Sequence, residues 1–142
     1  MQFKAYHANG ISINIPSSFK VDIFQKQSSY YIKNKGRSPI GFLFQIGVPQ
    51  EAFEAVTSTL ESLRNYIDQG TEVSIEINEP LALPKIGRYT KTTFKQLATN
   101  KINYNWHVVM IYGGVNIYMR FLANKDYSNL VDEIIALVSI VA

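Results

Sequence analysis

Between residues 102 and 121 apolar residues occupy every second position, and a pair of glycines interrupts this alternation once. Successive side chains of a strand point to opposite faces, so this period predicts two strands that each bury one face. Gly113-Gly114 fits the two-residue turn of a hairpin, because glycine tolerates the positive φ that such turns require. The alternating apolar positions are Ile102, Tyr104, Trp106, Val108, Met110 and Tyr112, then Val115, Ile117, Met119 and Phe121. An antiparallel sheet is therefore expected.

One long helix is predicted over residues 50–69. Pro49 stands where a helix can begin, because the first helical position needs no N–H partner. Glu51 and Glu54 lie in the first turn, where negative charge is favoured, and Gly70 is a natural stop. Apolar residues recur every three or four positions, as on one face of a helix. They are Phe53, Val56, Leu60, Leu63 and Ile67.

The remaining patterns place strands on both sides of this helix. Apolar side chains alternate or cluster in short runs that Gly, Pro and Ser separate, at residues 11–15, 19–23, 30–32, 42–48, 73–77 and 86–97. A second helix is predicted at the C-terminus, over 130–138. The chain of 142 residues fits a single domain, 1–142. We expect an α+β fold, with one largely antiparallel, twisted sheet of about seven or eight strands, one long central helix and one C-terminal helix.

The chain lacks the side chains that most reactive sites use. It has no Cys, which excludes disulfides, thiol catalysis and zinc sites with thiolate ligands. His7 and His107 are its only imidazoles, and neither falls in an HxH or HExxH spacing. Glu72, Glu76 and Glu79, and the pair Asp132 and Glu133, are best interpreted as solvated. We therefore expect no enzyme activity, no metal and no cofactor.

The charge pattern does not favour nucleic acid or membrane. Fourteen Lys and Arg against eleven Asp and Glu give a net charge of +3. The one basic cluster, Lys33, Lys35 and Arg37 near Lys26, is predicted to lie in a solvated loop over 33–39. No apolar stretch reaches the ~18 residues of a membrane span, and the start shows no signal-peptide pattern. We expect a cytoplasmic protein that binds no nucleic acid and does not insert stably into membranes.

Aromatic residues are the remaining signal: nine Tyr, eight Phe and one Trp. They can form core and cross-strand pairs, or a binding surface, since Tyr and Trp are enriched in interface hot spots. Two helices need not cover both sheet faces, so a partner protein or a second copy of the chain could cover one of them. The candidate contact residues are Phe42, Phe44, Tyr104, Trp106, Tyr112 and Tyr118.

The opening of the chain resembles that of a known fold family. The segment Gly10–Pro16, GISINIP, is followed by Phe19 and then by VDIF at Val21–Phe24. This strand, P-x-x-[FW], strand pattern is similar to the start of PsbP-like proteins of the DcrB and effector-associated (Eag) groups. The helix at 50–69 and the closing hairpin and helix also fit. The resemblance implies a PsbP-like fold and no catalytic residues.

The resemblance also implies a function. Eag proteins are chaperones of bacterial type VI secretion, which shield apolar segments of secreted effectors on their sheet. We therefore expect a non-catalytic protein-binding module, a chaperone or adaptor for a secreted effector. The alternative is an immunity protein that binds and neutralises a cognate bacterial toxin. Both would be small, would lack catalytic motifs and would bind another protein.

Overall fold

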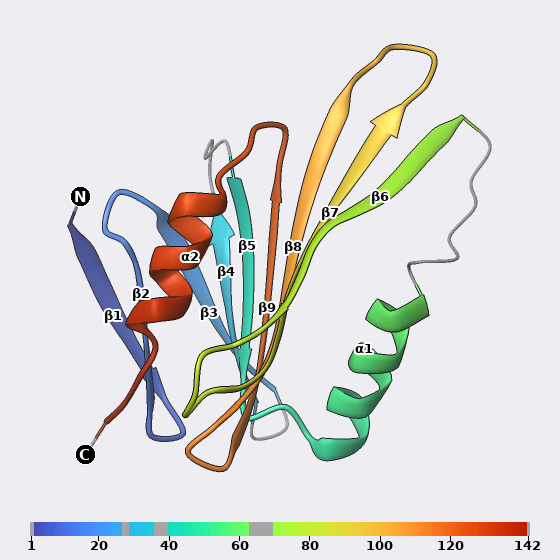
Figure 1. Ribbon diagram of the computed structural model, residues 1–142. Helices are drawn as coiled ribbons and strands as arrows, with labels where there is room; N and C mark the ends of the chain where they lie inside the picture. Colours follow the sequence, from blue (N-terminus) through green and yellow to red (C-terminus); the bar gives the residue numbers. More distant parts are fainter. Residues whose placement is uncertain (1, 27–28, 36–39, 63–69, 142) are drawn as a thin grey trace.

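The computed structural model describes residues 2–26, 29–35, 40–62 and 70–141, and side chains at 2–22, 40–59 and 70–141. In these residues ten strands form two antiparallel sheets (Figure 1). The smaller sheet has the order β1-β2-β10, with bounds Phe3–Ala8, Ile11–Pro16 and Ser139–Ile140. The larger has the order β3-β4-β5-β9-β8-β7-β6, with bounds Lys20–Lys26, Ser29–Lys35, Ile40–Ile46, Val115–Ala123, Ile102–Tyr112, Ile86–Gln96 and Thr71–Pro80. The helices are α1, Gln50–Ser62, and α2, Ser128–Leu137.

The α+β class, the antiparallel pairing and the two helices are as predicted. The prediction of a single sheet of seven or eight strands is wrong, because β1 and β10 form a separate small sheet with β2. The sequence FKAYHA of β1 lacks a clean alternation, and β10 has only two residues. Lys33–Lys35 end strand β4 and do not begin a loop, and residues 36–39 of the predicted loop lie outside the described part.

The hairpin of β8 and β9 forms as its sequence predicts. Tyr112 pairs with Val115 across the turn, and Trp106 pairs with Phe121 farther along. Gly113 and Gly114 have φ values of 57° and 74°, in the region where only glycine is unstrained. This register places the odd-numbered residues of β9 and the even-numbered residues of β8 on one face.

That face carries the main core. Side chains of β5, β8 and β9 pack there against the isoleucines of β2 and against Val131 and Ile134 of α2. Trp106, Phe44 and Phe121 are among the largest fully buried side chains. Phe42, Phe44 and Phe121 contact one another at ring-centroid distances of 4.7–5.6 Å. The small sheet and α2 therefore cover this face, called here the α2 face.

Helix α1 packs on the opposite face, called here the α1 face. A small cluster of Val48, Phe53 and Val109 anchors its first turns to the sheet. The Phe53 N–H donates to the carbonyl of Pro49, 2.9 Å away, so the helix begins where Pro49 predicts. It is described over Gln50–Ser62, and residues 63–69 of the predicted 50–69 lie outside the described part.

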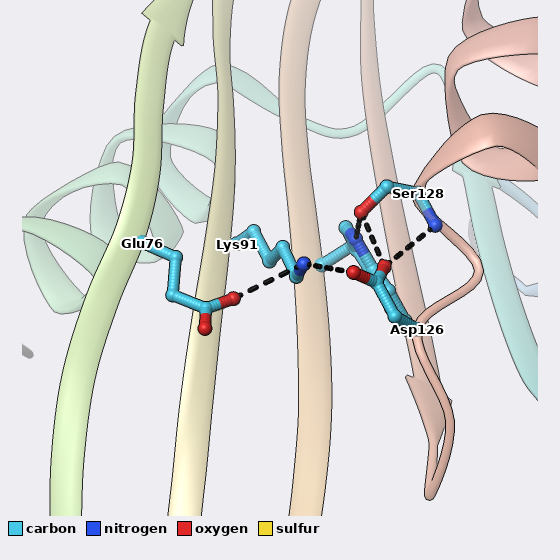
Figure 2. A network of polar contacts seen from close by, with 5 residues as sticks. Glu76, Lys91, Asp126 and Ser128 are labelled. Atoms are coloured by element: carbon cyan, nitrogen blue, oxygen red, sulfur yellow. Dashed lines mark hydrogen bonds and ion pairs between the residues drawn. The ribbon is translucent and has the colours of Figure 1, made fainter.

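An ion network around the buried Lys91 ties the far strands of the sheet to α2 (Figure 2). The Lys91 ammonium lies 3.1 Å from Glu76 Oε2 and 2.7 Å from Asp126 Oδ2. Asp126 Oδ1 accepts hydrogen bonds from the backbone N–H and the hydroxyl of Ser128, and Ser128 Oγ accepts one from the Trp106 indole at 3.3 Å. The partly exposed Asp126 carboxylate is thereby connected to the Trp106 indole in the core.

We expect Ser128→Ala to lower the free energy of unfolding by about 1–2 kcal/mol, because it leaves the Trp106 Nε1–H buried without an acceptor. Trp106 is the only tryptophan, so urea unfolding followed by its fluorescence measures the effect. The matched control is Ser58→Ala, at an exposed position of α1, which should change stability by less than about 0.5 kcal/mol. Equal effects of the two changes would contradict this role of Ser128.

Candidate binding groove beneath helix α1

A cavity of about 390 Å³ lies between helix α1 and the α1 face of the sheet. We call it the α1 groove. Its lining residues are Ala55, Val56 and Thr59 of α1, Phe94 of β7, Asn105 and His107 of β8, and Tyr118 and Arg120 of β9. Apolar groups therefore come mainly from the helix and the polar groups from the two central strands.

The period of two that buries Trp106 also directs its polar neighbours into this groove. Asn105 and His107 flank Trp106 in the sequence and so point to the opposite face. In the register, His107 pairs with Arg120, and Val109 pairs with Tyr118. Phe53 and Val109 hold the first turns of α1 close to the sheet, and the cavity opens beneath the following turns.

His107 is the most buried titratable group of the groove. Its side chain is 8% exposed, and its Nδ1 atom is buried without a hydrogen-bond partner among the described residues. The imidazole stacks on the Tyr118 ring at 6.4 Å. Burial, and to a smaller extent the charge of Arg120, lower the pKa of His107 to about 4. At neutral pH the imidazole is therefore uncharged.

Three more polar side chains of the groove lack a partner among the described residues, whereas the Thr59 hydroxyl donates to the carbonyl of Ala55. The side chains of Asn105, Tyr118 and Arg120 form no hydrogen bond or ion pair with any residue that the structure describes. Burial raises the pKa of Tyr118, although the charge of Arg120 opposes this, so its hydroxyl remains a neutral donor. The Thr92 hydroxyl, beside Asn105 in the register, is also buried without a described partner. Arg120 is exposed and Tyr118 half-buried, but Asn105, His107 and Thr92 are buried. Buried polar groups usually have partners, so these three side chains indicate a ligand.

The groove combines hydrogen-bonding and apolar groups. The lining offers hydrogen-bond donors in an apolar setting, and no Asp or Glu is among the lining residues described above. A catalytic His107 would need a carboxylate to orient it, and none of the hydrogen bonds in the described part of the chain supplies one. Across the described residues, no group of three or more His, Asp or Glu could hold a metal ion.

Five of the six predicted contact residues lie in or against the core on the α2 face, and Tyr118 lies on the α1 face. Phe42, Phe44 and Trp106 are buried in the core beneath α2 and the small sheet. Tyr104 also lies on the α2 face, stacked on Trp106 at 5.9 Å and beneath the Lys91 ammonium at 5.2 Å. Tyr112 packs beneath the Lys85 ammonium at 5.5 Å. Of the six, Tyr118 alone lines the α1 groove.

Sequence reasoning did not select Asn105, His107 and Arg120 as contact residues. Their signal is present in the sequence, because polar residues occupy alternate positions of strands whose other face is fully apolar. The same pattern is typical of a solvated face. Only the docking of α1 over these strands makes the three residues line a cavity.

A second cavity, of about 500 Å³, lies between α2 and the β6–β7 connection. Its ionisable groups are Glu79, Lys85, Tyr89, Tyr112 and Asp132. Lys85 donates from Nζ to the carbonyls of Ile135 and Ala136, at 2.9 and 3.1 Å, and so caps the end of α2. Burial, with the charges of Glu79 and Asp126, raises the pKa of Asp132. This cavity has more acidic than basic groups, in contrast to the α1 groove.

Comparison with known proteins finds likeness among solved structures. No family model matches the chain, and no curated protein matches it. Among solved structures, a crystal structure of a protein of unknown function from Pseudomonas aeruginosa covers 96% of this chain and 91% of its own, with a TM-score of 0.45 and 11% identity. Within the described residues, no helix is both long and apolar enough to cross a membrane.

Proposed function

We propose that the chain is a non-catalytic protein-binding module, which holds an apolar segment of a partner protein in the α1 groove. The observation that carries this proposal is the groove itself, whose lining combines apolar side chains with four polar side chains that have no partner in the described structure. Binding an apolar segment would remove Val56, Phe94 and the Tyr118 ring from water. It would also give the polar side chains partners.

The arrangement suits an amphipathic or apolar helix better than an extended strand. Helix-in-groove recognition inserts side chains spaced three and four residues apart into an apolar cleft. A cavity of about 390 Å³ accepts a few such side chains and leaves the helix backbone outside. An added strand would instead need a free edge, and the groove lies over the central strands β8 and β9.

The partner that we propose is a secreted bacterial effector, for which the chain acts as chaperone or adaptor in the cytoplasm. The PsbP-like resemblance of the first strands to Eag proteins supports this choice. An effector with apolar segments needs them shielded from water before export, which a binding groove supplies without any reaction. The PsbP-like assignment is part of the same proposal.

We expect the groove variant Tyr118→Ala to weaken binding of an apolar effector segment by about tenfold, a typical effect for an interface aromatic. The segment would come from an effector encoded beside this gene, fused to a soluble carrier, and its affinity would be measured by calorimetry. The matched control is Tyr112→Ala, at a half-buried tyrosine on the α2 face. Thermal unfolding of both variants would show that they remain folded.

Equal weakening by the two tyrosine changes would place the binding surface elsewhere. Failure of the wild-type protein to retain the apolar segment would end the chaperone proposal. An immunity protein would behave differently, because it would bind a folded toxin, and its affinity would not require an apolar segment. The same calorimetric measurement with the folded partner therefore separates the two functions.

A further inference from the structure

We infer that the segment held in the α1 groove carries an acidic side chain, whose carboxylate is received by Arg120 and the polar groups around it. This inference rests on the proposed function and specifies the chemistry of the partner. The groove supplies one full positive charge and several donors, and its lining contains no acidic residue. An apolar segment with one buried Asp or Glu is the complement of that lining.

Arg120 gives the groove its positive charge. It projects from β9 between its cross-strand neighbours Leu43 and His107, neither of which is charged at neutral pH. No carboxylate pairs with it in the part of the chain that the structure describes. The planar guanidinium matches a carboxylate with two parallel hydrogen bonds, an arrangement that is stronger than a bond between neutral groups.

The neighbours of Arg120 would complete the coordination of an anion. Asn105 offers amide N–H groups, Tyr118 a hydroxyl, and His107 a ring N–H, and none of the three is bonded to a described residue. A carboxylate accepts up to about four hydrogen bonds. A buried carboxylate is unfavourable unless it is paired and hydrogen-bonded, and this groove could provide both.

The apolar lining decides which acidic segment fits. Ala55, Val56 and Phe94 line the groove together with the donors and would contact the residues on either side of the carboxylate. A hydrophilic acidic peptide would leave these side chains facing polar groups. A basic residue at the same place would meet the Arg120 charge without an opposing carboxylate, so the groove should discriminate against it.

The experiment compares one apolar helical segment with Glu, Gln, Lys or Ala at its central position, on the same soluble carrier. We expect the Glu segment to bind at least about tenfold more tightly than the Gln segment, and the Lys segment to bind most weakly. Arg120→Met should remove the preference for Glu over Gln. Arg88→Met is the matched control, because Arg88 lies on the same face of β7 but outside the groove lining, and it should keep the preference.

A second readout follows His107 by NMR. A bound carboxylate favours the imidazolium, so the Glu segment should raise the pKa of His107 and bind more tightly as the pH falls from 7 to 5. Arg120 and Tyr118 on β9 and Arg88 on β7 are the ionisable groups on the neighbouring strands of this face, and the described α1 lining residues carry none. In His107→Gln this pH dependence should vanish while the Glu preference remains.

The outcomes separate this inference from the proposed function. Suppose that the Glu and Gln segments bind with equal affinity and that Tyr118→Ala weakens both. This result would overturn the inference of a bound carboxylate, while the proposed protein-binding function would stand. A Glu preference that survives Arg120→Met would also overturn this inference. Failure of all four segments to bind would overturn the proposed function together with this inference.

Discussion

The double variant Glu76→Gln, Asp126→Asn, which removes both carboxylates that face Lys91, is expected to have a free energy of unfolding about 3 kcal/mol lower than the wild type. The Lys91 side chain is 7% exposed, whereas those of Glu76 and Asp126 are 39% and 50% exposed. Burial alone would lower the pKa of Lys91, yet hydrogen bonds to the two carboxylates raise it. Without them, an ammonium would stay buried beside Tyr104 with no counter-charge. The half-exposed carboxylates place the effect at the lower end for a buried pair.

The control is the triple variant that adds Lys91→Met to the double change. Methionine has similar length without charge, so we expect it to recover most of the lost stability. Urea unfolding at pH 7, followed by Trp106 fluorescence, gives all three free energies. A double variant as stable as the wild type, or a triple variant no better than the double, would show that the network does not neutralise a buried charge.

The contribution of His107 is expected to lower the free energy of unfolding by about 3 kcal/mol as the pH falls from 6.5 to 4. The folded-state pKa of His107 is about 4, below the ordinary value of 6.5. In this window the unfolded chain binds a proton that the folded chain does not, so stability rises with pH and is lost on acidification. Unfolding in urea at a series of pH values between 7 and 4 measures the slope.

The variant His107→Gln should flatten the curve between pH 6.5 and 4, because the proton-binding difference is removed. His7→Gln is the matched control, since His7 is exposed on β1, and it should keep the wild-type slope. Asp126 acts in a separate window: the Lys91 ammonium, then Ser128, lower its pKa to about 2, so its contribution disappears only as the pH falls from about 4 to 2. An unchanged slope in His107→Gln would exclude His107 as the source.

The sequence was informative wherever a local rule decides the structure. The β8–β9 hairpin, the start of α1 at Pro49 and the face on which Trp106 lies all follow from periodicity and turn chemistry. The order of strands does not follow from local rules, because β5 pairs with β9, which is distant in the sequence. A period of two tells which side chains share a face, but it does not tell which face a helix covers. For this reason Phe42, Phe44 and Trp106 could be core or contact residues until α2 was placed.

The same limit applies to the groove. Asn105, His107 and Arg120 alternate with buried residues, as polar residues on a solvated face do. They line a cavity only because α1 docks through Phe53 and Val109, a contact between residues distant in the sequence. No local pattern marks that contact. The unused hydrogen-bonding groups therefore become visible only in the folded chain.

The pairing of β5 with β9 has a consequence for synthesis on the ribosome. Ile46 is opposite Ile117, so roughly 70 residues must be added before β5 finds its partner. At about 5–20 residues per second, this takes roughly 4–14 s. During that time the apolar face and one edge of β5 remain open in the nascent chain, in a form prone to association with other chains. A protein proposed to shield the apolar segments of others would thus have a period in its own synthesis when its central strand needs shielding.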